Sequence, residues 1–319
     1  MIPREWLHDA NRRIRPTAII TPITEDPQRG LFLKWENQQV TGSFKLRGAL
    51  NKVLTLEPWE RSKGLVTCSA GNHGQGIALA GEKTGSPVII FVSDHAVPSK
   101  LDAMQRYGAE LRLVSGGYAL AEKTARDFAA AEGMTFISPY NDGQVIAGQG
   151  TIGLELLEQI PEFSSVESIF IPLGGGGLLS GIAEALSEQS NCPRIIGVQS
   201  EASPYFHALF YQGSQSGVVE TESIADGLSG AVEEGSITIP LVRQLADEII
   251  LVTESEIEQA IKWCWNTYHE KIEGSAAAAL AAALRSQQLE TKKVVVISGG
   301  NIQPEVFQRI ISRREEAFQ

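Results

Sequence analysis

The sequence predicts an α/β fold with two open, mostly parallel twisted sheets and helices on both faces of the sheets. Short apolar runs alternate with helical stretches over most of the chain, which is typical of strand–helix units that form parallel sheets. Several of these runs end in glycine-rich turns, and ligands of such folds bind at the carboxyl ends of the strands. With 319 residues, the chain is long enough for two lobes.

The predicted elements follow one another closely. The first 30 residues are expected to form an entry helix and a proline-bracketed loop, and the region 200–240 is expected to be irregular. The run 88–92 is continuously apolar, as in a strand buried on both faces. Strands are expected at 31–36, 64–67, 88–92, 110–114, 168–173, 194–198, 249–252 and 294–297, and helices at 45–54, 77–83, 99–107, 119–131, 178–187, 254–269 and 275–287, with one more that opens at 148–151.

Composition and charge exclude several classes of partner. The chain is 43% hydrophobic and 20% charged, as in ordinary globular proteins, and its 27 basic and 38 acidic residues give a net charge of −11. No basic cluster stands out, which argues against nucleic acid or an anionic membrane as partner. Apolar runs of about 18 residues and a signal peptide are both absent. Three separated cysteines without a CxxC pattern indicate reduced thiols in the cytoplasm and no zinc site.

The segment 41–48 contains the most informative single residue, Lys45. It lies at the start of a predicted helix, where the helix dipole favours anions over cations. Two interpretations are open at this point. Lys45 is either a solvated surface charge on an ordinary turn or a reactive lysine that forms a Schiff base with a carbonyl group.

Two glycine-rich turns follow predicted strands and precede helices. Residues 174–177 are four consecutive glycines, whose backbone N–H groups at a helix N-terminus suit a phosphate; the alternative is a tight turn. The turn 69–76 could hold a carboxylate through N–H groups and the Ser69 hydroxyl, and Asn72 could reach a ring oxygen of a cofactor. His73 alone is more typical of a structural hydrogen-bonding group than of a base. Neither turn has the GxGxxG or GK(S/T) pattern of nucleotide sites.

Two further residues lie where a cofactor could meet them. Ser298 follows the last predicted strand, where its hydroxyl could bond a heteroaromatic nitrogen. Glu273 precedes an alanine-rich helix, and it either stabilises that helix N-terminus or faces the cofactor. A reactive lysine, a phosphate site, a carboxylate site and this serine together match the requirements of pyridoxal 5′-phosphate acting on an amino acid.

The motifs also occur in the order of a known family. The chain resembles the fold-type II pyridoxal-phosphate enzymes (tryptophan synthase β-like) of the threonine/serine dehydratase, or ammonia-lyase, and serine racemase group. The resemblance covers almost the whole chain and rests on residues 34–37 with 41–49, 69–76, 97–100, 107–110, 148–152, 174–178 and 298–301. It implies a large cofactor-binding domain of residues 1–50 and 140–319 and a small, mobile substrate-closing domain of residues 51–139. It also implies a homodimer. Because the chain ends at Gln319, we expect no C-terminal regulatory domain.

The resemblance also assigns roles to residues. It implies that pyridoxal 5′-phosphate is bound covalently to Lys45, with Phe44 beside the ring. Asn72 would hold the ring hydroxyl and Ser298 the pyridine nitrogen. The phosphate would be held by Gly174, Gly175, Gly176, Gly177 and Leu178, and the substrate carboxylate by Ser69, Asn72 and His73.

The implied reaction is an α,β-elimination that converts a β-hydroxy amino acid into a 2-oxo acid and ammonia. L-Threonine, L-serine and a relative such as 3-hydroxyaspartate are the expected substrates, and the sequence does not separate them. Lys45 would take the α-proton, and the neutral partner Ser298 favours prompt loss of the β-hydroxyl. The substrate side-chain pocket is expected to draw on residues 138–142 and 225–230.

Two departures from the family pattern narrow this expectation. Serine racemases of the family carry a serine where this chain has Ala70, so racemisation is expected to be poor. The family's cation site pairs a glutamate, matched by Glu201, with an aspartate six residues on, where this chain has His207, so no metal is expected. Serine racemase is the nearest alternative. A β-replacement enzyme such as cysteine synthase usually has threonine in place of His73, and a catalytically silent homologue would not need Lys45.

Overall fold

The computed structural model describes residues 1–94, 98–286 and 291–312, which form two sheets. The larger has the strand order β1 (Ile23–Asp26), β2 (Leu31–Trp35), β10 (Lys292–Ile297), β7 (Val166–Pro172), β8 (Arg194–Ser200) and β9 (Glu248–Val252). The smaller has the order β5 (Glu110–Val114), β4 (Val88–Ser93), β3 (Leu65–Cys68) and β6 (Thr135–Phe136). Within the described residues, every neighbouring pair of strands is parallel except β1 and β2. The predicted fold class is confirmed.

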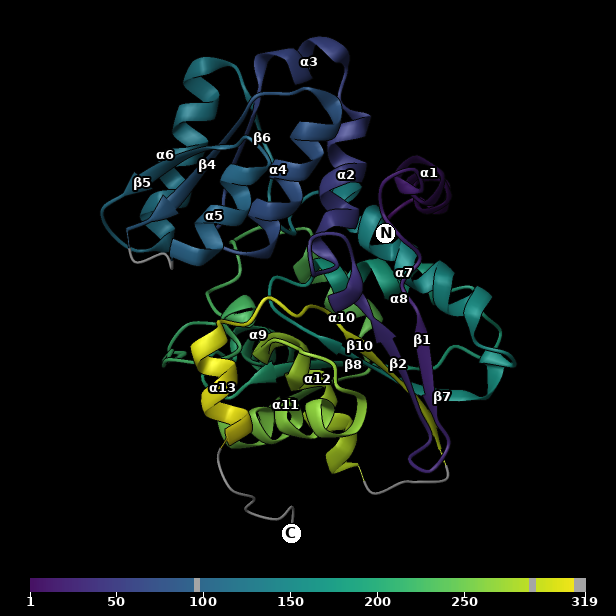
Figure 1. Ribbon diagram of the computed structural model, residues 1–319. Coiled ribbons are helices and arrows are strands. Elements are labelled where there is room, and N and C mark those ends of the chain that lie inside the picture. Colours follow the sequence, from purple (N-terminus) through teal and green to yellow (C-terminus); the bar gives the residue numbers. More distant parts are fainter. Residues whose placement is uncertain (95–97, 287–290, 313–319) are drawn as a thin grey trace.

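Helices surround both sheets (Figure 1). Those of the first half are α1 (Arg4–Ile14), α2 (Lys45–Thr55), α3 (Pro58–Lys63), α4 (Asn72–Thr84), α5 (Pro98–Arg106), α6 (Tyr118–Glu132) and α7 (Gly143–Gln159). Those of the second half are α8 (Gly177–Leu186), α9 (Tyr205–Gln212), α10 (Thr238–Leu245), α11 (Glu254–Tyr268), α12 (Gly274–Arg285) and α13 (Pro304–Ser312). The short 3₁₀ turns are η1 (Glu36–Gln38), η2 (Phe163–Ser165) and η3 (Asp226–Leu228). The smaller sheet with α4, α5 and α6 occupies the upper part of Figure 1, and the larger sheet lies below it.

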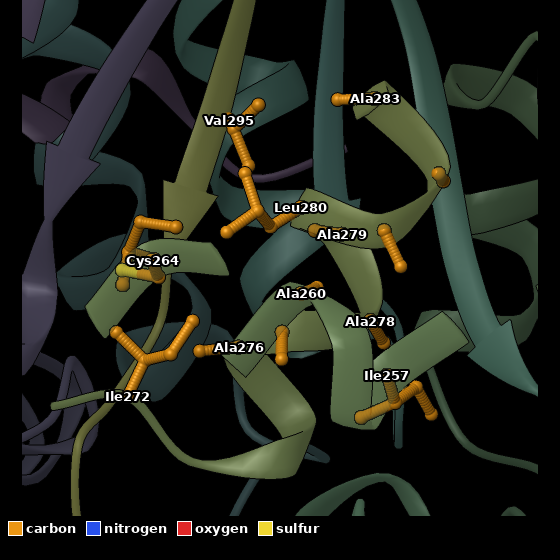
Figure 2. Close-up of a cluster of buried hydrophobic side chains, with 14 of the residues drawn as sticks. Ile257, Ala260, Cys264, Ile272, Ala276, Ala278, Ala279, Leu280, Ala283 and Val295 are labelled. Atoms are coloured by element: carbon orange, nitrogen blue, oxygen red, sulfur yellow. The ribbon is translucent and has the colours of Figure 1, made fainter. Parts of the chain in front are cut away.

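The larger sheet is buried on both faces, as its continuous apolar strands predict. Along β10, Val295 and Ile297 pack with α11, α12 and α13, whereas Val294 and Val296 pack on the opposite face with α7, α8 and α10. The alanine-rich helix α12 lies against the first of these faces, where its small side chains allow a close approach (Figure 2).

The smaller sheet also has a core on each face. The larger of the two is built from β3 and β4 with α2 and α4, and the other lies under α6. Helix α2 of this core also crosses α7 closely: a Cβ added at Gly148 would lie 2.6 Å from the Arg47 carbonyl oxygen. The predicted motif at 148–151 therefore includes a close contact between two helices. Any side chain at position 148 would prevent this contact.

Some predicted boundaries were wrong. Helix α7 begins at Gly143 rather than at 148–151, because the Asp142 side chain caps it by accepting from the backbone N–H groups of Gln144 at 2.8 Å and Val145 at 3.1 Å. Helix α4 begins at Asn72 rather than at 77. The sequence interpretation missed β1, β6 and α3, and it treated 200–240 as irregular although α9 and the start of α10 lie there. Residue 97 of the motif 97–100 and residue 287 of the predicted helix 275–287 lie outside the described residues.

The smaller sheet and its strands fall inside the predicted small domain, 51–139. The domain boundaries themselves, and the mobility of that segment, stay predictions.

Candidate active site

The predicted site residues come together in one cleft of about 1560 Å³. Strands of both sheets point their carboxyl ends at it, since Cys68 ends β3 and Pro172 ends β7. The lining includes every residue that the sequence interpretation assigned to the cofactor or to the substrate carboxylate: Phe44, Lys45, Ser69, Asn72, His73, Gly174, Gly175, Gly176, Gly177, Leu178, Glu273 and Ser298.

Backbone contacts tie Lys45 to the end of the last strand. Ser43 forms an isolated antiparallel bridge with Gly299, and the Phe44 N–H donates to the Ser298 carbonyl at 3.0 Å. Lys45 and Ser298, far apart in the sequence, are therefore held on one wall of the cleft. The Lys45 Nζ donates to the Pro139 carbonyl at 2.9 Å and lies 5.2 Å from the centroid of the Phe44 ring.

Burial changes the acidity of Lys45. It lowers the pKa of the ammonium group to about 8, and the negative charge of Glu273 offsets part of that effect. A solvated surface lysine would not lose its proton so readily. The structure therefore favours the reactive-lysine interpretation of the segment 41–48.

The glycine loop 174–177 has the geometry of an anion site. Gly176 is the N-cap of α8 and has φ of +87°, a conformation that favours glycine. A Cβ added at Gly175 would lie 2.2 Å from the Tyr140 ring. The first residues of α8, Gly177 and Leu178, have N–H groups without an intrahelical acceptor, and the helix dipole adds positive potential there. These residues fit the phosphate of pyridoxal phosphate.

Glu273 and Asn72 are joined across the cleft. The Asn72 Nδ2 donates to Glu273 Oε1 at 2.8 Å, and the Asn72 Oδ1 accepts from Asn301 Nδ2 at 2.7 Å. Asn301 in turn donates to the Thr41 carbonyl at 2.9 Å. Glu273 occupies the N-cap position of α12, yet among the described residues its side chain makes no capping hydrogen bond to that helix. The cleft-facing interpretation of Glu273 is therefore the better one.

His73 is a buried neutral group. Its Nε2 lies 3.2 Å from the Ile137 carbonyl oxygen, and burial, together with the charge of Lys45, lowers its pKa to about 3. In the described part of the chain its Nδ1 has no hydrogen-bond partner. The ring therefore serves as a hydrogen-bonding group without charge. The Ser69 hydroxyl accepts from the Gly71 N–H at 3.2 Å, within the same turn.

The residues considered for a cation lie elsewhere. Glu201 is exposed and outside the cleft lining, and the His207 ring lies 4.7 Å from the ring of Tyr211. The described residues contain no group of three His, Cys, Asp or Glu side chains that could hold a metal ion.

The two segments predicted for the substrate side-chain pocket line the cleft in part. Pro139 and Tyr140 represent the segment 138–142, and residues 226–230 represent the segment 225–230; residues 138, 141, 142 and 225 are not among the lining residues. Sequence reasoning missed Arg126 of α6, which also lines the cleft and pairs with Glu122 at 2.7 Å and with Glu233 at 2.9 Å. Glu122 and Arg126 are four residues apart on one helix, a spacing that the sequence itself shows, whereas Glu233 meets Arg126 only through the tertiary structure.

Comparisons with known proteins agree on one family. The family model described as pyridoxal-phosphate dependent enzyme matches residues 11–300. L-Threonine ammonia-lyase of Thermotoga maritima is 38% identical over 98% of this chain and 79% of its own length. L-Threonine dehydratase catabolic TdcB of Escherichia coli (strain K12) is 40% identical over 85% of this chain and 83% of its own. Among solved structures, maize serine racemase has a TM-score of 0.88 and 33% identity, covering 96% of this chain and 95% of that one.

Proposed function

The chain belongs to the family of pyridoxal-phosphate-dependent enzymes, and from this premise we propose the residues that carry its reaction and the substrate that it prefers. It is a lyase that converts a β-hydroxy amino acid into a 2-oxo acid and ammonia, as its similarity to threonine ammonia-lyases over most of the chain supports. The single observation that carries the proposal is Lys45, a partly buried lysine of lowered pKa in a cleft that also contains the glycine loop.

The cofactor would be held at four points. Lys45 would bind its aldehyde carbon, the N–H groups of residues 174–178 its phosphate, Asn72 its ring hydroxyl and Ser298 its pyridine nitrogen. When bound, pyridoxal phosphate supplies a ring that withdraws electrons from the substrate α-carbon. Asn72 is kept in place by Glu273 and Asn301, so its amide is orientated before any ligand arrives.

Lys45 is the proposed general base. With a pKa near 8, a useful fraction of its amine is neutral at physiological pH and can accept the α-proton. The β-hydroxyl leaves with a proton as water, and the enamine that is released tautomerises and hydrolyses to the 2-oxo acid and ammonia. His73, which is neutral and buried, would contribute hydrogen bonding near the substrate carboxylate and not a second base.

The charge of the cleft favours a substrate with a neutral side chain. Its lining contains the basic residues Lys45, Lys123 and Arg126 and the acidic residues Glu122, Glu220, Glu222, Asp226, Glu233 and Glu273. Arg126, which could otherwise bind a second carboxylate, is already paired with two of these acids. We therefore propose L-threonine or L-serine as substrate in preference to 3-hydroxyaspartate. A comparison of kcat/KM for the three amino acids tests this, and a preference for 3-hydroxyaspartate would contradict it.

Replacement of Lys45 tests the mechanism directly. Lys45→Ala is expected to lose 2-oxo acid production from L-threonine and to lose the absorbance of the lysine-bound cofactor. Glu270→Gln, a surface change near Asn37 and Gln38, is the matched control and should keep both. A Lys45→Ala protein with full activity would refute the proposed role.

Serine racemase is the second candidate, because maize serine racemase is a close structural relative. Ala70 lines the cleft and carries no group that can donate a proton. Incubation with L-serine should therefore yield pyruvate with little D-serine. Ala70→Ser is the informative variant, since it restores a hydroxyl at that position. Substantial D-serine from the unaltered enzyme would contradict our interpretation of Ala70.

We further propose a homodimer in the cytoplasm. Support comes from family resemblance and from three cysteines that form no disulfide among the described residues. None of the described helices has the length and apolar character needed to cross a bilayer. Sedimentation velocity of the purified protein tests the dimer, and a monomer at micromolar concentration would refute it.

A further inference from the structure

The loop 138–142 connects the smaller sheet to α7, and its residue Tyr140 contacts two other parts of the site. Its hydroxyl accepts a hydrogen bond from the Glu233 N–H at 2.9 Å. Its ring lies against the glycine loop. Its neighbours reinforce the arrangement: the Pro139 carbonyl accepts from Lys45 at 2.9 Å, and the Asn141 Oδ1 accepts from the Ile237 N–H at 3.0 Å.

The contact between the ring and the glycine loop is very close. A Cβ added at Gly175 would lie 2.2 Å from one ring carbon of Tyr140 and 2.3 Å from another. A Cβ at Gly177 would lie 3.1 Å from the Cα and the Cβ of Tyr140. Among the four glycines only Gly176 has positive φ, so the backbone conformation does not require glycine at 175. Glycine is required at 175 because the ring of Tyr140 leaves no room for a Cβ there.

The hydroxyl end of the same side chain is also fixed. Glu233, whose N–H it accepts, pairs through its carboxylate with Arg126 of α6 at 2.9 Å. Burial raises the pKa of Tyr140 to about 12, so the phenol keeps its proton at physiological pH. The ring is therefore held at one end by the 233–237 segment while its face supports the glycine loop.

We propose that Tyr140 is a positioning residue for the cofactor phosphate. Its ring holds the backbone of residues 175–177 so that the N–H groups at the start of α8 keep their direction towards the phosphate oxygens. This inference rests on the proposed function, because it assumes that the glycine loop binds the phosphate of pyridoxal phosphate. It assigns no chemical step to Tyr140.

Affinity for two forms of the cofactor separates a phosphate effect from a general one. Cofactor-free protein is titrated with pyridoxal phosphate and with pyridoxal, which lacks the phosphate, and binding is followed by absorbance. Tyr140→Ala is expected to weaken the binding of pyridoxal phosphate by about tenfold or more, the equivalent of one charge-assisted hydrogen bond. It should weaken the binding of pyridoxal by less than about twofold. Tyr140→Phe, which keeps the ring, should stay within about twofold of the wild type for both.

A matched control uses another tyrosine of the cleft. Tyr118 also lines the cleft, and its hydroxyl lies 3.5 Å from the Cys68 carbonyl oxygen. Tyr118→Ala should leave the ratio of the two affinities unchanged. An unchanged ratio in Tyr140→Ala, or an equal loss in Tyr140→Phe, would overturn the proposal. Failure of the wild type to bind pyridoxal phosphate would instead refute the proposed function.

A double-mutant cycle tests the contact itself and needs pyridoxal phosphate alone. Gly175→Ala introduces the Cβ that collides with the ring, so it should weaken binding by about tenfold or more in the wild-type background. In the Tyr140→Ala background the collision is absent, and the further loss should be less than about twofold. Additive losses in the two backgrounds would show that the ring and the loop act independently and would overturn the proposal.

Discussion

Lys45 shows how one residue takes its chemistry from its surroundings. The segment 41–48 places a lysine where a helix would prefer an acid, and the structure shows that burial lowers its pKa to about 8 while Glu273 holds the pKa up. The neutral amine, the form that attacks a carbonyl, therefore dominates above about pH 8 in the cofactor-free protein.

The pH dependence of cofactor binding follows from this balance. The association rate of pyridoxal phosphate should rise as pH increases through about 8, because the neutral amine is the nucleophile. Glu273→Gln removes the charge that raises the pKa of Lys45, so the midpoint should move to lower pH. Stopped-flow absorbance over a pH series measures both. Glu270→Gln should leave the midpoint unchanged, and a midpoint that rises in Glu273→Gln would contradict the assignment.

At the scale of elements, a buried ion cluster fixes the helix that carries Lys45. Arg47 donates to Glu36 with its Nε and one terminal nitrogen, at 2.8 Å each, and to Glu155 at 2.7 and 2.9 Å. Lys34 donates to Glu155 at 2.6 Å. All four side chains are buried, and they join β2, η1, α2 and α7. The cluster holds the first turn of α2 against the larger sheet.

Removal of one member should be costly for stability. Arg47→Met leaves Glu36 and Glu155 buried without their shared partner, so the free energy of unfolding should fall by about 3–5 kcal/mol. Urea denaturation measures it. Arg194→Met breaks the exposed pair with Glu248 and should cost no more than about 1 kcal/mol. Equal effects of the two substitutions would contradict the role of burial.

At the scale of the whole molecule, side chains near the cleft connect the two sheets. Asn72 at the start of α4 binds Glu273 before α12, and Arg126 of α6 binds Glu233 from the segment before α10. The Arg126 guanidinium also lies 4.3 Å from the Phe136 ring centroid. All four residues of these two contacts lie in the cleft lining, so both contacts join parts of the chain on either side of it.

Loss of the Arg126–Glu233 pair should make the segment 229–236, which contributes to the cleft lining, less rigid. Arg126→Met is expected to speed amide hydrogen exchange in residues 229–236 by up to about fivefold, the size of a partly exposed ion pair. Hydrogen exchange with mass spectrometry measures the rates. High salt screens the ion pair of the unaltered protein, so the difference in rate between the two proteins should shrink there. Glu122→Gln removes only the partner on the same helix and should leave this segment unchanged. The same acceleration in both variants would contradict a role for the pair between the walls.

The sequence predicted the fold class and most of the strands because periodicity and apolar runs are local properties. It missed β1, β6, α3 and α9, which are short or lie among prolines and glycines, where local propensity is weak. It placed the start of α7 late because the glycines at 148 and 150 resemble a helix opening, whereas Asp142 is the residue that caps it.

The residues of the candidate site could be predicted because their chemistry lies in contiguous motifs. Lys45, the glycines 174–177 and Ser298 each stand at the end of a strand or the start of a helix, and the topology of parallel sheets brings such ends to one place. Their contacts could not be predicted. Residues 138–142 were expected only as a side-chain pocket and Asn301 only as part of the motif 298–301, and which atoms Pro139, Tyr140 and Asn301 meet depends on the tertiary structure.

By itself, the sequence determined the α/β scaffold and predicted a reactive lysine at position 45 and an anion loop at 174–177, since those properties reside in residue type and spacing. Only the tertiary structure decided that Lys45 has a pKa near 8, that His73 is neutral, that Glu273 faces Asn72 and that the Tyr140 ring lies against the glycine loop. The physical reason is that burial, charge proximity and steric contact depend on distances between residues far apart in the chain.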